Sequence, residues 1–230
     1  FAPFHETFTT MAYLAATTKT IKLSSGVLIL PQRQTGLVAK QAAEVDLLSD
    51  GRLRLGVGVG WNHVEYEALD CEWKTRGIKQ AEQIEVLRKL WTEELVTFEG
   101  HFHKYNEVTI VPSPKQRPIP IWIGGSADKV IKRAAKLGDG WMPILLPDKE
   151  GKTALEKLYT YLEEFGRKRE GFGIEVWMRF SEDNPEVWGA TADEWRSMGV
   201  DMAMLYPMWE IKGVDGQIEI LRKFKEVAHS

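Results

Sequence analysis

Glycines near the end of one apolar run carry the first hint of chemistry. Gly56, Gly58 and Gly60 alternate along this run. They do not match the dinucleotide fingerprint G-x-G-x-x-G, because Trp61 or His63 stands where the third glycine would be. Two interpretations stay open. The glycines form a strand end that allows close packing, or the missing side chains let a flat ring approach the backbone.

A second group of small residues follows another apolar run. Gly124, Gly125 and Ser126 come directly after residues 121–123, and a helix-like segment follows them. Backbone N–H groups at a helix N-terminus bind phosphate well, and glycines let the anion come close. The motif therefore predicts either a phosphate-binding turn or a plain tight turn.

Histidine and cysteine give no clear metal or nucleophile motif. His101 and His103 would share one face of a strand, but two imidazoles without a third ligand favour a solvated hairpin edge. Cys71 is the single cysteine, which excludes a disulfide framework and an all-cysteine metal site. The sequence contains no G-x-S-x-G, H-E-x-x-H, P-loop or C-x-x-C motif. We expect no metal site and can assign no catalytic residue.

Charge and composition narrow the class of protein. The 230 residues carry a formal net charge of −3, and 43% of them are hydrophobic. This balance gives no electrostatic footprint for nucleic acid or an anionic membrane. No apolar run approaches the roughly 18–20 residues of a membrane-spanning helix. We therefore expect a globular cytoplasmic protein that acts on a small molecule.

Strand-like and helix-like segments must position these motifs, and they alternate along the chain. The nearly continuous apolar runs, which suit parallel strands buried on both faces, are residues 21–30, 52–59, 119–123, 140–146, 174–180 and 200–206. Segments with helical apolar spacing are residues 8–16, 38–48, 78–91, 130–137, 155–165 and 218–227. Such alternation predicts parallel β/α units.

Local signals mark the ends of these segments. The glycines of 49–51 and 137–140 each follow a helix-like segment, where glycine ends a helix in the left-handed conformation. Residues 91–119 break the alternation and predict a short hairpin followed by a proline-rich return. We expect its turn at residues 98–101 and an extended segment at 108–111.

The pattern predicts an α/β protein of the TIM (β/α)8 barrel class, formed as one domain over residues 1–230. Six strands are visible, whereas a closed barrel of this class has eight. The chain begins with Phe1 rather than Met and lacks a signal-peptide pattern. We therefore expect an N-terminally truncated barrel that lacks its first two strands.

The sequence resembles the bacterial luciferase-like monooxygenase superfamily, whose members are flavin- or deazaflavin-dependent (β/α)8 barrels. The resemblance lies in segments that follow one another in the order of the family: LAATTKTIKL (14–23), GVLILP (26–31), AKQAAEVDLLSDGR (39–52), GVGVGW (56–61), IWIGGS (121–126) and GDGW (138–141). It is greatest for the branch that uses coenzyme F-420, a deazaflavin.

The resemblance implies a set of cofactor-binding residues. A strand bulge, with a non-prolyl cis bond between Gly26 and Val27, would support the back of the ring. The full set it implies is Ser25, Gly26, Val27, Gly58, Gly60, Trp61, Glu65, Gly124, Gly125, Ser126, Gly140 and Trp141. Of these, Gly124, Gly125 and Ser126 would hold the phosphate.

The resemblance also implies an activity and partners. With coenzyme F-420 the reaction would be hydride transfer, and with FMN it would be oxygenation, with a flavin reductase as partner. Relatives are commonly homodimers. Two alternatives stay open: a non-catalytic flavin-binding relative with an incomplete active site, and an unrelated barrel enzyme that binds a sugar phosphate at residues 124–126.

Overall fold

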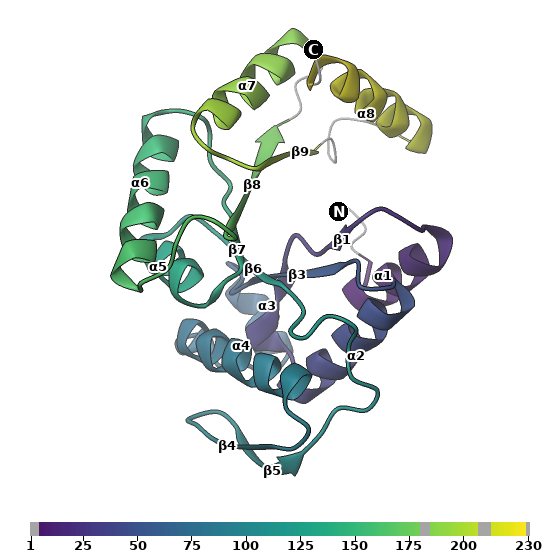
Figure 1. The fold of residues 1–230 in the computed structure, drawn as a ribbon, viewed down its shortest axis with the longest axis vertical. Coiled ribbons are helices and arrows are strands. Elements are labelled where there is room, and N and C mark those ends of the chain that lie inside the picture. Colours follow the sequence, from purple (N-terminus) through teal and green to yellow (C-terminus); the bar gives the residue numbers. More distant parts are fainter. Residues whose placement is uncertain (1–4, 180–184, 207–212, 229–230) are drawn as a thin grey trace. The chain divides into compact units, whose positions relative to one another are not determined.

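Parallel strands joined by helices make up both parts of the chain (Figure 1). The computed structural model describes residues 5–179, 185–206 and 213–228. The chain divides after Gly124 into two compact units, Phe1–Gly124 and Gly125–Ser230. Among the described residues, no helix has the length and apolar character needed to cross a bilayer. The predicted α/β class with parallel pairing is confirmed.

The sheet of the first unit is centred on one strand. Its members are β1 (Leu23–Ser24), β2 (Leu28–Ile29), β3 (Leu53–Gly58) and β6 (Ile121–Gly124). Both β1 and β2 pair with β3, and β3 pairs with β6, all in parallel. The single strand expected over residues 21–30 is thus two short strands, interrupted at residues 25–27.

Helices cover this sheet and are packed on one another. They are α1 (Thr7–Thr17), α2 (Thr35–Leu48), α3 (His63–Ala68) and α4 (Arg76–Thr92), with the 3-10 turn η1 (Leu30–Gln32) between β2 and α2. The small buried residues Ala39, Ala42 and Ala43 let α2 approach its neighbours closely. The sequence does not predict α3, since six residues are too few to show helical periodicity.

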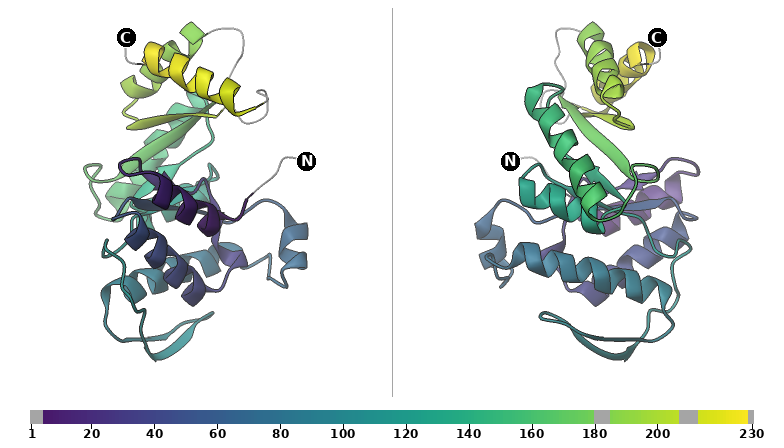
Figure 2. Two further views of the ribbon diagram at one scale, coloured as in Figure 1. Left: turned by 90° about the vertical axis from the view of Figure 1, so that its right-hand side faces the viewer. Right: turned by 60° about the vertical axis from the view of Figure 1, so that its left-hand side comes forward.

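A hairpin follows α4, as predicted. It consists of β4 (Val96–Glu99) and β5 (Lys104–Val108), which pair antiparallel and lie beyond α4 at the edge of the unit (Figures 1 and 2). Its turn spans residues 100–103 rather than 98–101, because the N–H of Gly100 donates to the carbonyl of His103 at 2.8 Å. The expected extended segment 108–111 contributes only its first residue to a strand.

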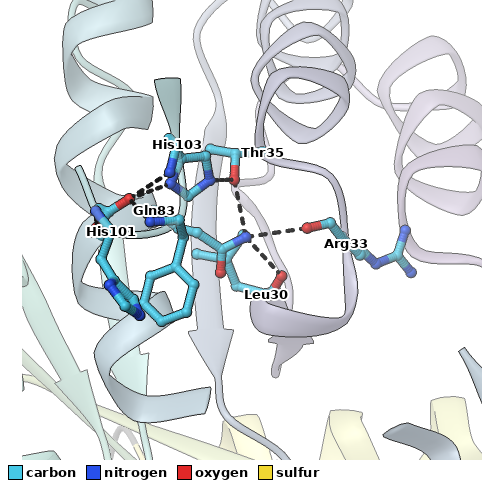
Figure 3. A network of polar contacts seen from close by, with 8 residues as sticks. Leu30, Arg33, Thr35, Gln83, His101 and His103 are labelled. Carbon is cyan, nitrogen blue, oxygen red and sulfur yellow. Dashed lines mark hydrogen bonds and ion pairs between the residues drawn. The ribbon is translucent and has the colours of Figure 1, made fainter. Parts of the chain in front are cut away.

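Glu82 of α4 fixes this turn through bonds to residues that include His101 and His103, both labelled in Figure 3. Its carboxylate accepts hydrogen bonds from the backbone N–H groups of His101, Phe102 and His103, each at 2.8 Å. It also lies 2.7 Å from His103 Nδ1. The His103 side chain is only 9% exposed. The expectation of a solvated hairpin edge is therefore wrong for His103, although His101 is exposed.

The second unit repeats the parallel pattern. Its strands pair in the order β7 (Gly140–Met142), β8 (Gly173–Arg179) and β9 (Met202–Tyr206). Its helices are α5 (Asp128–Leu137), α6 (Lys149–Glu164), α7 (Pro185–Ser197) and α8 (Val214–Ala228). The sequence does not predict α7. Phe180, the expected last residue of the strand over 174–180, lies outside the described residues.

The two predicted helix ends use glycine for different reasons. Gly51 has a φ of +78° and donates its N–H to the carbonyl of Asp46 at 2.8 Å, as expected for a left-handed terminator. Gly138 instead has a φ of −81°. A Cβ there would lie 2.9 Å from the carbonyl oxygens of Ala134 and Gly140. The left-handed prediction is wrong at Gly138, where lack of space requires glycine.

Arg52 joins the start of β3 to the end of α1. Its guanidinium donates to the carbonyls of Ala15, Thr18 and Ile21 at 2.7–3.0 Å and to the Thr18 hydroxyl at 2.9 Å. Its Nε donates to the carbonyl of Ser49 at 2.6 Å. The side chain is buried, as are Ala15 and Ser49, so the carbonyls of these two residues depend on Arg52 rather than on water.

We expect Arg52→Met to lower the free energy of unfolding by about 3 kcal/mol, because it leaves the buried carbonyls of Ala15 and Ser49 without their charged donor. Urea denaturation would measure the change. Lys22→Met, at an exposed lysine nearby, is the matched control and should change stability by less than about 0.5 kcal/mol. Equal effects of the two substitutions would contradict the assigned role of Arg52.

Because the pKa of Glu82 is shifted, we expect the stability of the protein to depend on pH. Burial alone would raise the pKa of Glu82, but the hydrogen bonds from His103 and the turn outweigh it and hold this pKa below its usual value. A carboxyl with a lowered folded pKa stabilises the protein above its unfolded pKa of about 4.3. This contribution is lost as the pH falls through the folded value.

We therefore expect Glu82→Gln to destabilise the protein at pH 7 by about 1–3 kcal/mol and to have a shrinking effect below about pH 4. Denaturation of both proteins at a series of pH values would measure this. Glu85→Gln, at an exposed glutamate of the same helix, should leave the pH profile unchanged. A Glu82→Gln penalty that stays constant down to pH 3 would show that ionisation of Glu82 is not involved.

Candidate functional site

The glycines of the first unit lie at the carboxyl ends of neighbouring parallel strands. Gly58 is the last residue of β3 and Gly124 the last residue of β6. The register pairs Val57 with Ile123, so the two strands end side by side. In parallel α/β proteins this edge of the sheet is where ligands bind.

The segment between β1 and β2 is held against β3. The peptide bond between Gly26 and Val27 is cis, as the family resemblance implies. Ser25 is buried, and its hydroxyl donates to the carbonyl of Gly56 at 2.8 Å. This bond fixes the bulge to the neighbouring strand at the level of the glycines.

Two aliphatic side chains occupy the space that the glycines leave. A Cβ on Gly58 would lie 2.6 Å from Val27 Cγ2, and a Cβ on Gly60 would lie 3.1 Å from Ile29 Cγ2. Gly60 also has a φ of +70°, which side chains rarely adopt. The glycines therefore make room for Val27 and Ile29, which remain partly exposed. We call these four residues the apolar wall.

Polar and aromatic residues follow the apolar wall along the chain. Trp61 is 87% exposed. Asn62 caps α3 by accepting a hydrogen bond from the N–H of Val64 at 3.1 Å. The exposed Glu65 accepts from Asn62 Nδ2 at 3.2 Å and from Gln32 Nε2 at 3.4 Å. These bonds connect the start of α3 to η1, next to the apolar wall.

Tyr66 supports this region and is not identified by the sequence analysis. It is 1% exposed, and its hydroxyl donates to the carbonyl of Val59 at 2.6 Å. Its ring packs edge-on against Trp73, with 5.1 Å between centroids. Burial raises the pKa of Tyr66 to about 12, so the phenol stays neutral and remains a donor. Its position after the α3 cap is the only sequence signal for this role.

Arg54 and Trp122 form a further contact that the sequence does not reveal. The guanidinium of Arg54 lies 4.1 Å from the centre of the Trp122 ring, and its Nε donates to the Ser24 hydroxyl at 3.2 Å. The contact joins β1, β3 and β6. It requires three strands from distant parts of the chain, so no local pattern could predict it.

The second unit contains the turn that precedes α5. Gly125 has a φ of +116° and accepts a hydrogen bond at its carbonyl from Trp141 Nε1 at 2.8 Å. The hydroxyl of Ser126 contacts both the N–H and the carbonyl of Ile144 at 3.3 Å. Gly140 begins β7, directly before Trp141. The turn is thus held by β7 and the segment after it. We call residues 125–127 the phosphate turn, after the role that the sequence resemblance implies for this motif.

The N-terminus of α5 suits an anion. Its N-cap is Ala127, which has no side chain that could accept from the N–H groups of the first turn. Those groups and the helix dipole favour a negative charge. Asp128 lies in the same turn, but hydrogen bonds from Tyr161 and Lys157 hold its pKa below the usual value. Its carboxylate is therefore already engaged.

The predicted site residues thus fall into two groups. The first unit contains Ser25, Gly26, Val27, Gly58, Gly60, Trp61, Glu65 and Gly124. The second unit contains Gly125, Ser126, Gly140 and Trp141. In the first unit the group lies at the carboxyl ends of β1, β3 and β6 and in the segments that follow these strands. In the second unit Trp141 contacts Gly125, whereas Gly140 lies at the start of β7. Among the described residues, no cluster of three or more His, Cys, Asp or Glu side chains could hold a metal ion.

The strand pairing, the apolar wall and the phosphate turn define the chain as a parallel α/β protein with features that suit a planar ligand and an anion. The family model described as luciferase-like monooxygenase matches residues 1–205. The chain belongs to this family, as the sequence resemblance predicts.

Curated relatives include enzymes of two cofactor types. The chain is 31% identical over 180 residues to the F420-dependent glucose-6-phosphate dehydrogenase of Kineococcus radiotolerans, covering 75% of this chain and 53% of the relative. It is 33% identical over 139 residues to the FMNH(2)-dependent dimethylsulfone monooxygenase of Pseudomonas putida, covering 59% and 38%. The chain spans about half the length of the curated relatives it matches.

Solved structures show the same fold. The monooxygenase RslO1 from Streptomyces bottropensis superposes with a TM-score of 0.86 at 22% identity, covering 96% of this chain and 81% of that protein. At this identity the similarity establishes the fold alone. The α/β fold of this chain is thus that of luciferase-like proteins.

Because Gly58 and Val27 are in contact, we expect substitutions at these two positions to have coupled effects on stability. We expect Gly58→Ala to lower the free energy of unfolding by about 1–3 kcal/mol, because its methyl group would overlap Val27. Val27→Ala alone should also destabilise, but adding it to Gly58→Ala should restore part of the loss. A double-mutant cycle measured by urea denaturation gives the coupling. Strict additivity would contradict the contact.

Proposed function

We propose that this chain binds FMN or coenzyme F-420 and takes part in the oxidoreduction of a small organic substrate. One observation carries this proposal: the family match over residues 1–205 includes both the apolar wall and the phosphate turn. Relatives named for F420 and for FMNH(2) support both cofactors as candidates. Hydride transfer would follow with coenzyme F-420 and oxygenation with FMN.

The apolar wall is suited to the ring of such a cofactor. Val27 and Ile29 offer an aliphatic surface without hydrogen-bond donors, and the Ser25 bond to Gly56 keeps the bulge in place. In this proposal, residues 25–27 with Gly58 and Gly60 support the ring, while Trp61 and Glu65 lie at its edge. The cofactor supplies the redox chemistry, and these residues orient the ring and exclude water.

The phosphate turn is suited to the anionic part of the cofactor. The backbone N–H groups of Ser126 and the first turn of α5 would donate to the phosphate, and Gly124 and Gly125 would allow its close approach. Trp141 would act on the turn by donating to the carbonyl of Gly125.

Homodimer formation and a reductase partner for FMN are further proposals. Large apolar side chains on α1 and α2 are exposed, namely Tyr13, Leu14, Leu37 and Leu48. Such a surface is compatible with a second copy of the chain.

Titration of the protein with FMN and with coenzyme F-420, followed by cofactor fluorescence, would test the function. We expect one of them to bind and to bind at least about tenfold more tightly than the matching compound without phosphate, which is riboflavin for FMN. A tenfold difference corresponds to about 1.4 kcal/mol, within the range of charge-assisted hydrogen bonds. Absence of binding for both cofactors would contradict the proposal.

Two further outcomes separate the alternatives. Binding without turnover of alcohols, aldehydes or enones would favour a non-catalytic flavin-binding relative. Equal affinities for FMN and riboflavin would show that the phosphate turn does not contribute to cofactor binding.

A further inference from the structure

We propose that Gln83 of α4 is a positioning residue for the cofactor, acting through the turn that follows the apolar wall. The inference rests on the proposed function for the identity of the ligand. Its physical basis is a hydrogen-bond network, buried at Gln83, that reaches from the β4–β5 hairpin to η1 (Figure 3).

Gln83 holds both ends of one short turn. Its side chain is completely buried. The amide nitrogen lies 3.2 Å from the carbonyl of Leu30, 3.1 Å from the carbonyl of Arg33 and 3.0 Å from the Thr35 hydroxyl. One amide group thus joins the start of η1, its C-cap and the first residue of α2.

This turn directly continues the apolar wall. Leu30, the first residue of η1, follows Ile29, whose Cγ2 lies over Gly60. Ile29 also pairs with Gly58 in the β2–β3 register. Since consecutive residues are covalently joined, a shift of the Leu30 carbonyl moves the backbone of Ile29. Gln83 therefore fixes the backbone position of Ile29, and with it the position of the apolar surface that would contact the ligand.

The rest of the network fixes the direction of these bonds. Glu82 accepts from His103 Nδ1 at 2.7 Å, so we assign the proton to Nδ1 and a lone pair to Nε2. The Thr35 hydroxyl, 2.6 Å from His103 Nε2, then donates to it. Its oxygen remains available to accept from Gln83. The hairpin and α4 thus orient Thr35, and Thr35 and Gln83 together hold the turn.

Gln80 offers a matched control in the same helix. It is also completely buried and lies three residues before Gln83. Within the described part of the chain, the amide oxygens of both glutamines lack a hydrogen-bond partner, but the amide nitrogen lacks one only in Gln80. Replacement of either glutamine by methionine keeps a similar length and volume. The two substitutions therefore differ mainly in the bonds to the turn.

The experiment compares Gln83→Met and Gln80→Met with the unmodified protein. We expect Gln83→Met to weaken binding of FMN or coenzyme F-420 at least tenfold and to shift the absorbance spectrum of the bound cofactor. In the free protein, it should speed amide hydrogen exchange at residues 26–34 at least tenfold. Gln80→Met should change affinity and exchange by less than twofold.

Thr35→Val gives a second measurement if Gln83→Met does not fold. It removes the hydroxyl acceptor but keeps the shape of the side chain, so we expect smaller changes in the same direction. Unchanged exchange at residues 26–34 in Gln83→Met, or equal effects of Gln83→Met and Gln80→Met, would overturn the inference. Faster exchange in a protein that binds neither cofactor would instead overturn the proposed function, while Gln83 would still be shown to hold the turn.

Discussion

The close packing of Val27 and Ile29 on glycines is the constraint on which the rest of the first unit depends. A Cβ on Gly58 would lie 2.6 Å from Val27, so β2 and its bulge can approach β3 only because that atom is missing. Interiors are close-packed, and an extra methyl group cannot be absorbed without a shift of the backbone. The strand pairing, the bulge and the partly exposed aliphatic surface therefore arise together.

Buried polar side chains near the apolar wall hold its backbone in place and do not form part of its exposed surface. Two neighbouring glutamines on α4 illustrate the difference. Gln83 donates to a turn that continues from β2, whereas Gln80 has no partner among the described residues. Burial of an amide is unfavourable unless it is hydrogen-bonded. Gln83 meets this condition through its bonds to η1, a segment next to the candidate site. The same network of bonds includes the hairpin.

In the second unit, the phosphate turn is likewise held in place by hydrogen bonds from neighbouring segments. Side chains satisfy the loop that leads into α5: Trp141 donates to Gly125, and Ser126 bridges to Ile144. The N-cap Ala127 offers no side-chain acceptor to the first turn of the helix, in which the N–H of Val130 donates to the Ala127 carbonyl at 2.7 Å. A loop held by such bonds before a helix N-terminus without a side-chain cap is a common physical solution for anion binding.

The sequence by itself determined the alternation of parallel strands and helices, the family, and the positions of the glycine motifs, because these depend on local periodicity and on residue type. It did not determine α3, whose six residues are too short for a periodic signal, or the low exposure of the His103 side chain, which in the sequence resembles a polar hairpin residue. The bond from Glu82 to His103 joins residues 21 positions apart, and that from Gln83 to Leu30 joins residues 53 positions apart. Only the tertiary structure decided these contacts, since a hydrogen bond between distant segments depends on how the intervening elements pack and leaves no pattern in either segment.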